Sequence, residues 1–311
     1  MARYLITGVA GFIGSNLAEA LLAAGESVRG LDDFSTGRRE NLEGLDGLEF
    51  VEGDIRDLET CRAACGGVDF VLHQAALGSV PRSIADPITS NAANVTGTLN
   101  LLVAARDAGV RRLVFAASSS AYGDTPTLPK VETMPARPLS PYAITKYAGE
   151  EYCRTFTALY GFETVALRYF NVFGRRQDPH STYAAVIPKF ASALLKGQAP
   201  EIHGDGEQTR DFTHIANVVQ ANRKACQAPA EACGQVYNVA CGERISLNRL
   251  YRRIAELLGS DVEPHYGPPR PGDVRDSLAD IEKARRLLGY VPTHTVEQGL
   301  AEAIQWYREN L

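Results

Sequence analysis

The sequence predicts an α/β protein in which a Rossmann-type, doubly wound parallel sheet precedes a smaller C-terminal α/β lobe. Over the first 120 residues, short apolar runs alternate with segments of helical periodicity, and a glycine-rich turn follows the first run. Uninterrupted apolar runs are typical of parallel strands that helices cover on both faces. After about Tyr169 this rhythm loosens, and prolines and polar stretches interrupt the chain. We therefore expect ligands to bind at the edge where the strands of the sheet end.

The predicted elements follow one another along the chain. Strands are expected over residues 4–7, 28–31, 48–51, 70–73, 112–116 and 164–167. Helices are expected over residues 12–24, 88–108 and 141–160. We assign residues 1–170 to a nucleotide-binding Rossmann domain, to which later segments at about 213–240 return. Residues 171–311 are assigned mainly to the second lobe.

The composition excludes several functional classes. The 311 residues carry a net charge of −5, with 45% hydrophobic and 22% charged residues, which is the usual balance of a globular protein. This mild negative charge offers no basic surface to nucleic acid, and no apolar run is long enough to span a membrane. The N-terminus lacks the features of a signal peptide, and six cysteines without a C-x-x-C pair favour a reducing compartment. We expect a cytoplasmic protein without a nucleic-acid or membrane partner.

A glycine-rich turn is the strongest local motif. Gly8, Gly11 and Gly14 form a G-x-x-G-x-x-G pattern between the first strand and the first helix, with Phe12 and Ile13 inside it. Glycines permit a tight turn and a close approach of the backbone to a pyrophosphate, which the N-terminus of the helix attracts. In this strand–turn–helix context the motif predicts dinucleotide binding rather than a purely structural turn.

Acidic residues after the next two strands refine the choice of cofactor. Asp32 ends the second strand, 18 residues after the last glycine of the motif, close to the spacing of about 20 expected for a ribose-binding acid. Its carboxylate would accept hydrogen bonds from both ribose hydroxyls and repel a 2′-phosphate, which favours NAD over NADP. Arg38 and Arg39 lie near enough to host such a phosphate and leave that alternative open. Asp54, followed by Ile55, is placed to reach the adenine amine.

A tyrosine and a lysine share one face of a predicted helix. Ser140 is a favourable N-cap and Pro141 a favourable first helical residue. Tyr142 and Lys146 are then one turn apart, and the ammonium would favour the phenolate of the tyrosine. Lowering a tyrosine pKa from ~10 towards 7 requires about 4 kcal/mol, which the lysine and a positively charged nicotinamide could supply together. A surface pair on the helix is the alternative interpretation.

Three consecutive serines, Ser118, Ser119 and Ser120, follow the predicted strand 112–116. They would lie at the C-terminal edge of the sheet, where ligands bind in open α/β folds. Their hydroxyls could hydrogen-bond a substrate hydroxyl close to the Tyr142–Lys146 pair, although such runs are also common in loops.

The six histidines are scattered along the chain, without an H-x-x-x-H or Cys/His grouping. This spacing does not indicate a metal site, and we expect none. His73 ends a predicted strand and is expected to be a packed residue.

In combination and in this order, the motifs resemble those of the extended short-chain dehydrogenases/reductases of the nucleotide-sugar epimerase/dehydratase group, and within it the UDP-hexose 4-epimerases. The resemblance spans essentially the whole chain. Besides the motifs above, it rests on the stretches His73-Gln-Ala-Ala76, Asn94-Val-Thr-Gly97-Thr98, Arg168-Tyr-Phe-Asn171-Val-Phe-Gly174, Thr209-Arg210-Asp211-Phe212 and Arg270-Pro-Gly-Asp273.

The resemblance implies a role for each matching residue. Tyr142 would be the catalytic acid/base, Lys146 would tune it and hold the nicotinamide ribose, and Ser118 would orient the reacting hydroxyl. Implied contacts with NAD are Gly8, Gly11, Phe12, Ile13, Gly14, Asp32, Asp54, Ile55, Gln74, Ala75, Ala76, Asn94, Tyr142 and Lys146. Implied contacts with the UDP-sugar, bound mainly by the second lobe, are Ser79, Arg82, Ser118, Ser119, Ser120, Tyr142, Asn171, Ala185, Arg210, Arg270 and Ser277. Relatives pair through the helices equivalent to residues 88–108 and 141–160, which implies a homodimer.

The group carries out several reactions, and the residues beside Ser118 distinguish them. Dehydratases of the group carry an Asp-Glu pair where this chain has Ser119 and Ser120, and the decarboxylases tend to place a Glu in this run. No cysteine is placed to form the thiohemiacetal of a 6-dehydrogenase. The resemblance therefore implies a 4-epimerase, in which C4 of the sugar is oxidised transiently to a ketone and reduced from the opposite face.

A non-catalytic NAD sensor is the alternative from another functional class. A sensor of this kind predicts the loss of Tyr142, Lys146 or Ser118, and all three are present.

One position bears on the choice of sugar. Beyond the Arg-x-Gly-Asp stretch, 4-epimerases confined to UDP-glucose carry a bulky tyrosine, whereas a small residue leaves room for an N-acetyl group. This chain has Ser277 there, and Ser79, Ser119, Asn171 and Ala185 also resemble the acetyl-accepting subgroup. We expect interconversion of UDP-GlcNAc and UDP-GalNAc, with UDP-Glc and UDP-Gal as slower substrates. A strict UDP-glucose 4-epimerase and a UDP-glucuronate-using epimerase or decarboxylase are the alternatives.

Overall fold

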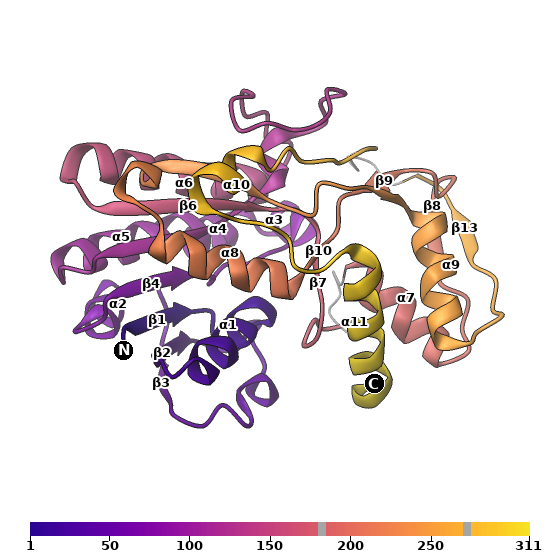
Figure 1. The fold of residues 1–311 in the computed structure, drawn as a ribbon, viewed down its shortest axis with the longest axis horizontal. Coiled ribbons are helices and arrows are strands. Elements are labelled where there is room, and N and C mark those ends of the chain that lie inside the picture. The colour runs from indigo at the N-terminus through magenta and orange to yellow at the C-terminus, as the bar shows by residue number, and fades with distance from the viewer. Residues whose placement is uncertain (180–184, 270–274) are drawn as a thin grey trace.

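The computed structural model describes residues 1–179, 185–269 and 275–311. Its largest sheet has seven strands in the order β11-β6-β5-β4-β1-β2-β3, and every neighbouring pair is parallel (Figure 1). The strands are β1 (Arg3–Thr7), β2 (Ser27–Asp32), β3 (Leu48–Glu52), β4 (Phe70–His73), β5 (Arg112–Ser118), β6 (Glu163–Tyr169) and β11 (Gln235–Val239). The predicted fold class, a Rossmann-type doubly wound sheet with a second lobe, is confirmed.

Helices cover both faces of this sheet because alternate strand residues point to opposite faces. Tyr4 and Ile6 of β1 pack in one core with α1 (Phe12–Ala23) and α8 (Ile215–Gln227). Leu5, between them, packs in a second core with α2 (Leu58–Cys65), α5 (Gly97–Asp107) and α6 (Pro141–Tyr160). Burial on both faces explains why the strands are apolar without alternation.

The helical stretch predicted over residues 88–108 is confirmed, although it contains a π-helical turn. It consists of α4 (Pro87–Asn91), the π-helical turn η2 (Ala92–Thr96) and α5, and a short helix, α3 (Val80–Ala85), precedes it. Asp86 caps α4 by accepting a hydrogen bond from the Thr89 N–H, so a separate helix begins there. The π turn adds a residue per turn without breaking the apolar stripe, and sequence periodicity does not reveal it.

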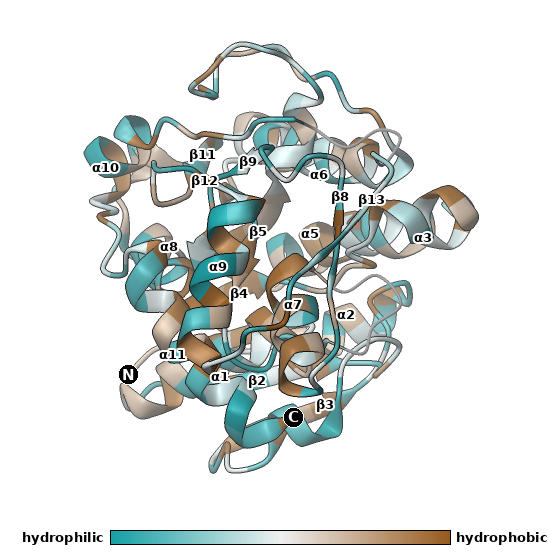
Figure 2. Cartoon of the chain, turned by 90° about the vertical axis from the view of Figure 1, so that its right-hand side faces the viewer, coloured by the Kyte–Doolittle hydropathy of each residue, from teal (hydrophilic) through white to brown (hydrophobic). Residues whose placement is uncertain are grey.

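The C-terminal lobe has a core of its own, built from α7 (Val186–Leu195), α9 (Leu247–Leu258) and α11 (Val296–Asn310). Three two-stranded pairs surround it: β7 (Val172–Phe173) with β10 (Thr213–His214), β8 (Glu201–His203) with β13 (His265–Gly267), and β9 (Thr209–Arg210) with β12 (Ile245–Ser246). Figure 2 shows hydrophilic and hydrophobic residues alternating along α9, whose apolar face meets this core. α10 (Glu282–Leu288) packs against β11, so the chain returns to the large sheet.

Short 3-10 turns complete the described elements: η1 (Arg39–Leu42), η3 (Ser119–Tyr122) and η4 (Ala230–Ala232). Within the described ranges, no helix combines the length and the apolar character needed to cross a bilayer.

Candidate active site

Two adjoining cavities lie at the C-terminal edge of the large sheet. The larger, of about 670 Å³, is lined by the ends of β5 and β6, the first turns of α6 and residues of the lobe. The smaller, of about 140 Å³, lies beyond the ends of β2 and β3. Gln74 and Ala76, which follow β4, line both cavities. The strand order reverses between β1 and β4, which is where doubly wound sheets bind ligands.

The first turn of α6 places Tyr142 in the larger cavity. The Ser140 side chain accepts a hydrogen bond from the Ala143 N–H, and Pro141 is the first helical residue, as the sequence predicts. The Tyr142 N–H donates to Ser83 Oγ at 3.0 Å, which ties this turn to α3. The tyrosine is therefore held by the backbone at the helix start.

Lys146 lies one turn further along the same face and lines the same cavity. Its side chain is buried, and its ammonium donates to the Ala116 carbonyl at 2.8 Å. Burial lowers the pKa of Lys146 to about 8, against the opposing effect of the Glu150 carboxylate. Burial also raises the pKa of Tyr142, although a hydrogen bond with Ser118 acts in the other direction. The expected fall of the Tyr142 pKa is therefore not produced by the protein groups alone, because desolvation dominates.

A buried ion pair follows Lys146 on α6. Glu150 and Arg168 are 1% and 3% exposed. The guanidinium donates from Nε to Glu150 Oε1 at 2.8 Å and from Nη2 to Oε2 at 2.6 Å, and it lies 4.5 Å from the centre of the Tyr122 ring. These hydrogen bonds oppose the burial that raises the pKa of Glu150. This pair has no role predicted from the sequence, although the four-residue spacing from Lys146 to Glu150 indicates a shared helix face.

The serine run borders the same cavity. β5 ends at Ser118, whose hydroxyl oxygen accepts from the Ser120 N–H at 3.2 Å and from the Ser120 hydroxyl at 2.9 Å. All three serines line the cavity together with Tyr142 and Lys146. The structure thus brings together the two motifs that the sequence places at this edge.

The glycine turn is shaped by close backbone packing. Gly8 has a φ of +70°, and a Cβ there would lie 2.7 Å from the Ala75 nitrogen. A Cβ on Gly14 would lie 2.1 Å from the Gly8 carbonyl oxygen. Gly11 is the N-cap of α1 without a side-chain cap, and it lines the smaller cavity. The first N–H groups of α1 are therefore available to an anion, which fits the pyrophosphate of a dinucleotide.

Two predicted acids line the smaller cavity. The Asp32 carboxylate accepts from the Ala10 N–H at 2.9 Å and the Phe34 N–H at 2.8 Å, and burial raises its pKa. Each of its oxygens keeps a further lone pair, which suits a ribose diol. The Arg56 side chain donates to Asp54 at 2.7 Å and lowers the pKa of that carboxyl.

The polar loop after β2 is a part of this site that sequence analysis missed. Asp33, Ser35, Thr36 and Gly37 all line the smaller cavity. The signal was available, because the strand-end rule that selects Asp32 applies equally to the residues directly after it.

Most of the other predicted site residues line one of the two cavities. They are Phe12, Ile13, Ile55, Gln74, Ala75, Ala76, Asn171, Ala185, Arg210 and Ser277. Asn94 is buried outside both linings, where its side-chain oxygen accepts from the Leu77 N–H at 2.7 Å. Ser79 caps α3 by accepting from the Arg82 N–H at 3.2 Å, and neither residue belongs to the linings. Arg270 lies outside the described residues.

The lobe extends the site. A cavity of about 440 Å³ shares Asn171, Ala185 and Arg210 with the larger one and continues past Lys189 and Phe212. The sequence predicts these three shared residues but not the continuation of the cavity, because its walls come from five separate segments of the lobe.

Asp211 organises the lobe side of the site. It is fully buried, and its carboxylate accepts from the N–H groups of Cys241 and Gly242 and from that of Ala279, at 3.1–3.2 Å. Burial raises the pKa of Asp211 to about 7 despite these bonds. The carboxylate fixes the segment that carries Ser277 next to the strand that carries Arg210.

His73 is 1% exposed, with Thr7 Oγ1 at 2.7 Å from Nδ1 and Thr98 Oγ1 at 2.9 Å from Nε2. Burial lowers the pKa of His73 to about 3, so the ring is neutral. It is the packed residue that the sequence predicts.

The fold and the cavities define a Rossmann-type, dinucleotide-binding α/β protein with a tyrosine, a lysine and serines at the strand ends. The chain belongs to the NAD dependent epimerase/dehydratase family, whose model matches residues 4–240. NAD is thus the cofactor of its family, and the predicted family and cofactor are confirmed.

Similar proteins cover the chain from end to end. A UDP-glucose 4-epimerase of Mycolicibacterium smegmatis is 43% identical over 311 residues, which is 98% of each chain. The structure of a UDP-N-acetylglucosamine 4-epimerase from Methanobrevibacter ruminantium, in complex with UDP-N-acetylmuramic acid, is 38% identical, with a TM-score of 0.95 over 100% of this chain and 99% of that one. The structure of a Thermotoga maritima UDP-glucose 4-epimerase with UDP-glucose is 36% identical, with a TM-score of 0.94 over 99% of both chains.

Proposed function

We propose that the protein is an NAD-dependent UDP-sugar 4-epimerase, an isomerase, and that UDP-GlcNAc and UDP-GalNAc are its preferred pair. One observation carries the proposal: Tyr142, Lys146 and Ser118 line a single cavity into which the lobe places Arg210 and Ser277. The relatives support a UDP-sugar 4-epimerase in general, since they include enzymes named for both the plain and the acetylated sugar.

The two parts of the chain divide the ligands between them. Residues 1–170, with the returning segment 213–240, would bind NAD, and the rest of 171–311 would bind the UDP-sugar. The glycine turn would hold the pyrophosphate, Asp32 the adenosine ribose, and Asp54 the adenine. Gln74 and the two alanines after it would line the path to the nicotinamide.

Tyr142 is the proposed acid/base. As a phenolate, its oxygen would accept the proton of the C4 hydroxyl and later return it, while Ser118 would orient that hydroxyl by a hydrogen bond. The chemistry that bound NAD would supply is reversible acceptance of the C4 hydride, with a positive charge on its nicotinamide in the oxidised form. Because burial raises the pKa of Tyr142, the phenolate needs positive charge nearby, and Lys146 supplies the protein's share.

The second lobe would hold the nucleotide firmly and the sugar loosely. Arg210 and Arg270 would bind the diphosphate, because a guanidinium group can form two parallel hydrogen bonds to a phosphate. Asn171 would contact the sugar-side phosphate, and Ser119, Ser120, Ala185, Ser79 and Arg82 would border the sugar. A weakly held hexose can turn about its link to the diphosphate, which exposes its other face to the same hydride position.

The function is tested by offering the purified enzyme UDP-Glc, UDP-GlcNAc and UDP-glucuronate separately and following C4 inversion by NMR. The proposal expects inversion without net change of the NAD/NADH ratio, fastest with UDP-GlcNAc. Bound NAD without turnover of any UDP-sugar would instead favour a cofactor sensor. Loss of water or carbon dioxide from a substrate would favour a dehydratase or a decarboxylase.

The choice of sugar is tested at Ser277, which lines the larger cavity. Replacing Ser277→Tyr should lower kcat/KM for UDP-GlcNAc by about 10- to 100-fold and leave UDP-Glc within a few-fold, because the ring fills the space of the acetyl group. Ser277→Ala is the matched control and should preserve both. Unchanged activity of the tyrosine variant on UDP-GlcNAc would refute the steric argument.

A homodimer through residues 88–108 and 141–160 is also proposed. Ile88 of α4 and Ile144 of α6 are 81% and 55% exposed, and a partner would cover them. Light scattering after size-exclusion chromatography should give twice the mass of one chain. We expect the dimer to act in the cytoplasm.

A further inference from the structure

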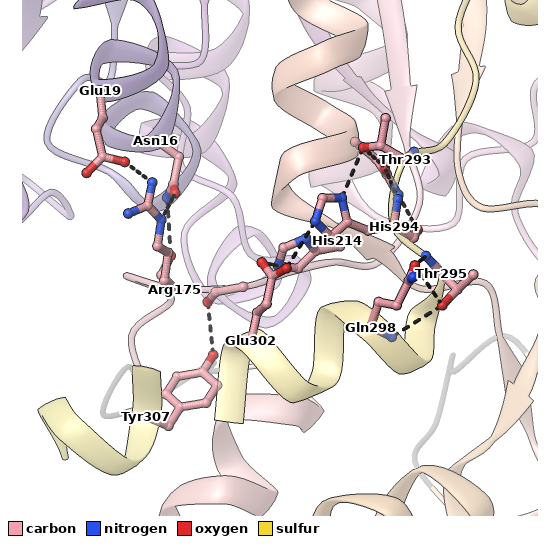
Figure 3. Close-up of polar contacts among 12 residues, drawn as sticks. Asn16, Glu19, Arg175, His214, Thr293, His294, Thr295, Gln298, Glu302 and Tyr307 are labelled. Carbon is pink, nitrogen blue, oxygen red and sulfur yellow. Dashed lines mark hydrogen bonds and ion pairs between the residues drawn. The ribbon is translucent and has the colours of Figure 1, made fainter. Parts of the chain in front are cut away.

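Three titratable side chains far apart in sequence meet where α11 packs against the start of α8. His214 ends β10, His294 lies in the segment before α11, and Glu302 projects from α11 (Figure 3). One ligand atom from each lies within 4.8 Å of those from the other two. The histidines are 80 positions apart in the chain, so sequence spacing gives no sign of this cluster.

Both imidazole rings present Nε2 to the same carboxylate. His294 Nε2 lies 3.1 Å from Glu302 Oε1, and His214 Nε2 lies 3.9 Å from Glu302 Oε2. Donors around tetrahedral zinc, at about 2.0–2.2 Å from the metal, are roughly 3.3–3.5 Å apart. The two separations in the structure, 3.1 and 3.9 Å, lie on either side of this value. The Glu302 side chain is 59% exposed and His294 26%, so both have room to close on an ion.

The surroundings orient the His294 ring as a ligand. The Thr293 hydroxyl lies 3.2 Å from Asn217 Oδ1, to which it donates, and 3.0 Å from His294 Nδ1. These contacts turn His294 Nε2 toward the Glu302 carboxylate, with which it forms a hydrogen bond of 3.1 Å. A cation bound between the two groups would take the place of that hydrogen bond. Second-shell hydrogen bonds of this kind are typical of metal-binding histidines.

His214 supplies an independent observation. Its side chain is 4% exposed, and its Nδ1 has no hydrogen-bond partner among the described residues. The packing that places it here is specific, because a Cβ on Gly299 of α11 would lie 2.7 Å from His214 Cβ.

One positive group faces the same space. Arg175 lines a cleft of about 260 Å³ together with His214 and Glu302. Its guanidinium donates to Asn16 Oδ1 at 2.9 Å and forms an ion pair with Glu19 (Figure 3). The Glu19 carboxylate also pairs with Arg176 at 2.9 Å and so serves both arginines, and Glu302 is the carboxylate that would balance part of the charge of an ion.

We propose that His214, His294 and Glu302 form a site for one divalent transition metal, of which zinc is the best match, and that the ion joins α11 to the β10–α8 junction. Two imidazoles and one carboxylate are a donor set that zinc takes in proteins, and the cleft leaves a fourth position for water. The ion would hold the C-terminal helix α11 against the β10–α8 junction. It would lie outside the larger cavity, which Tyr142 lines. The proposed site reverses the expectation, based on the spacing of the histidines, that the protein has no metal site.

The test measures binding directly on the full-length enzyme. Protein dialysed against a chelator is titrated with Zn²⁺ by calorimetry and, separately, with Co²⁺, whose d–d absorption reports four-coordinate binding. We expect one ion per chain and a Tm that rises with free zinc. His294→Ala and Glu302→Gln should each weaken binding by about 100-fold or more, since even second-shell losses cost 10- to 100-fold. Both changes are at partly exposed positions, so the variants should fold.

His265→Ala, which removes an exposed histidine outside the cluster, is the matched control and should bind zinc like the unaltered enzyme. The proposal is overturned if the unaltered enzyme shows no stoichiometric binding. It is also overturned if the His294→Ala and Glu302→Gln double variant retains the affinity, the cobalt spectrum and the zinc-dependent rise in Tm.

Discussion

The sheet edge and the C-terminal lobe build the two halves of the site in different ways. At the sheet edge, Tyr142 and Lys146 are one helical turn apart, and Ser118 ends the neighbouring strand. In the lobe, Arg210 and Ser277 reach the same cavity from separate segments that the Asp211 carboxylate helps to align. Local geometry therefore sets the chemistry, whereas long-range contacts set the shape around the sugar. The two halves should respond differently to substitution.

The largest effect is expected at Tyr142. Tyr142→Phe removes the hydroxyl that moves the proton, so kcat should fall by ~10³-fold while the affinity for UDP, held by the lobe, stays unchanged. Tyr147→Phe, on the same helix, is the control and should keep full activity. A parallel loss of UDP affinity would mean that the two halves are not separable as described.

Glu150 is expected to give the next largest effect, on stability. Glu150→Gln leaves the Arg168 guanidinium buried without its counter-charge, which should cost about 3 kcal/mol in the free energy of unfolding. Glu151→Gln removes an exposed partner of Arg154 and should cost less than about 1 kcal/mol. Equal midpoints for the two variants in urea denaturation would show that the buried pair contributes nothing specific.

Gly14→Ala should separate cofactor binding from nucleotide-sugar binding. The added Cβ would lie 2.1 Å from the Gly8 carbonyl oxygen, so the turn must shift, at a cost of about 1–3 kcal/mol. NAD affinity should fall at least tenfold, while UDP affinity, measured by calorimetry, should remain. Gly66→Ala is the control, since its Cβ would meet its nearest neighbour at an ordinary 3.5 Å. If the Gly14→Ala variant bound NAD with wild-type affinity, the glycine turn would not be part of the cofactor site.

The smallest effect concerns the pH dependence of stability. Because the pKa of Lys146 is lowered to about 8 in the folded protein, unfolding takes up a proton between pH 8 and the ordinary lysine pKa near 10.5. The Lys146 contribution to stability therefore rises with pH in this window, by at most about 1.4 kcal/mol per pH unit. The stability difference between the enzyme and Lys146→Met should change in the enzyme's favour from pH 8 to 10. A difference that is flat over this range would contradict the lowered pKa.

The sequence predicts those features of the fold and the site that are set by residues close together along the chain. The parallel strands, the start of α6 at Ser140 and the meeting of the serines with Tyr142 all follow from local patterns. The π turn inside the helical stretch 87–107 does not, because the apolar stripe continues through it. The raised pKa of Tyr142 and the convergence of His214 with His294 depend on tertiary burial, which no single segment encodes.

The central claim is that C4 of the sugar is oxidised and reduced again in a cavity that keeps the hydride from solvent. Its most direct test is the epimerisation of a UDP-hexosamine carrying deuterium at C4, run in ordinary water and followed by mass spectrometry and NMR. Retention of the label at C4 of the inverted product is the predicted result. Loss of the deuterium to solvent would contradict the account.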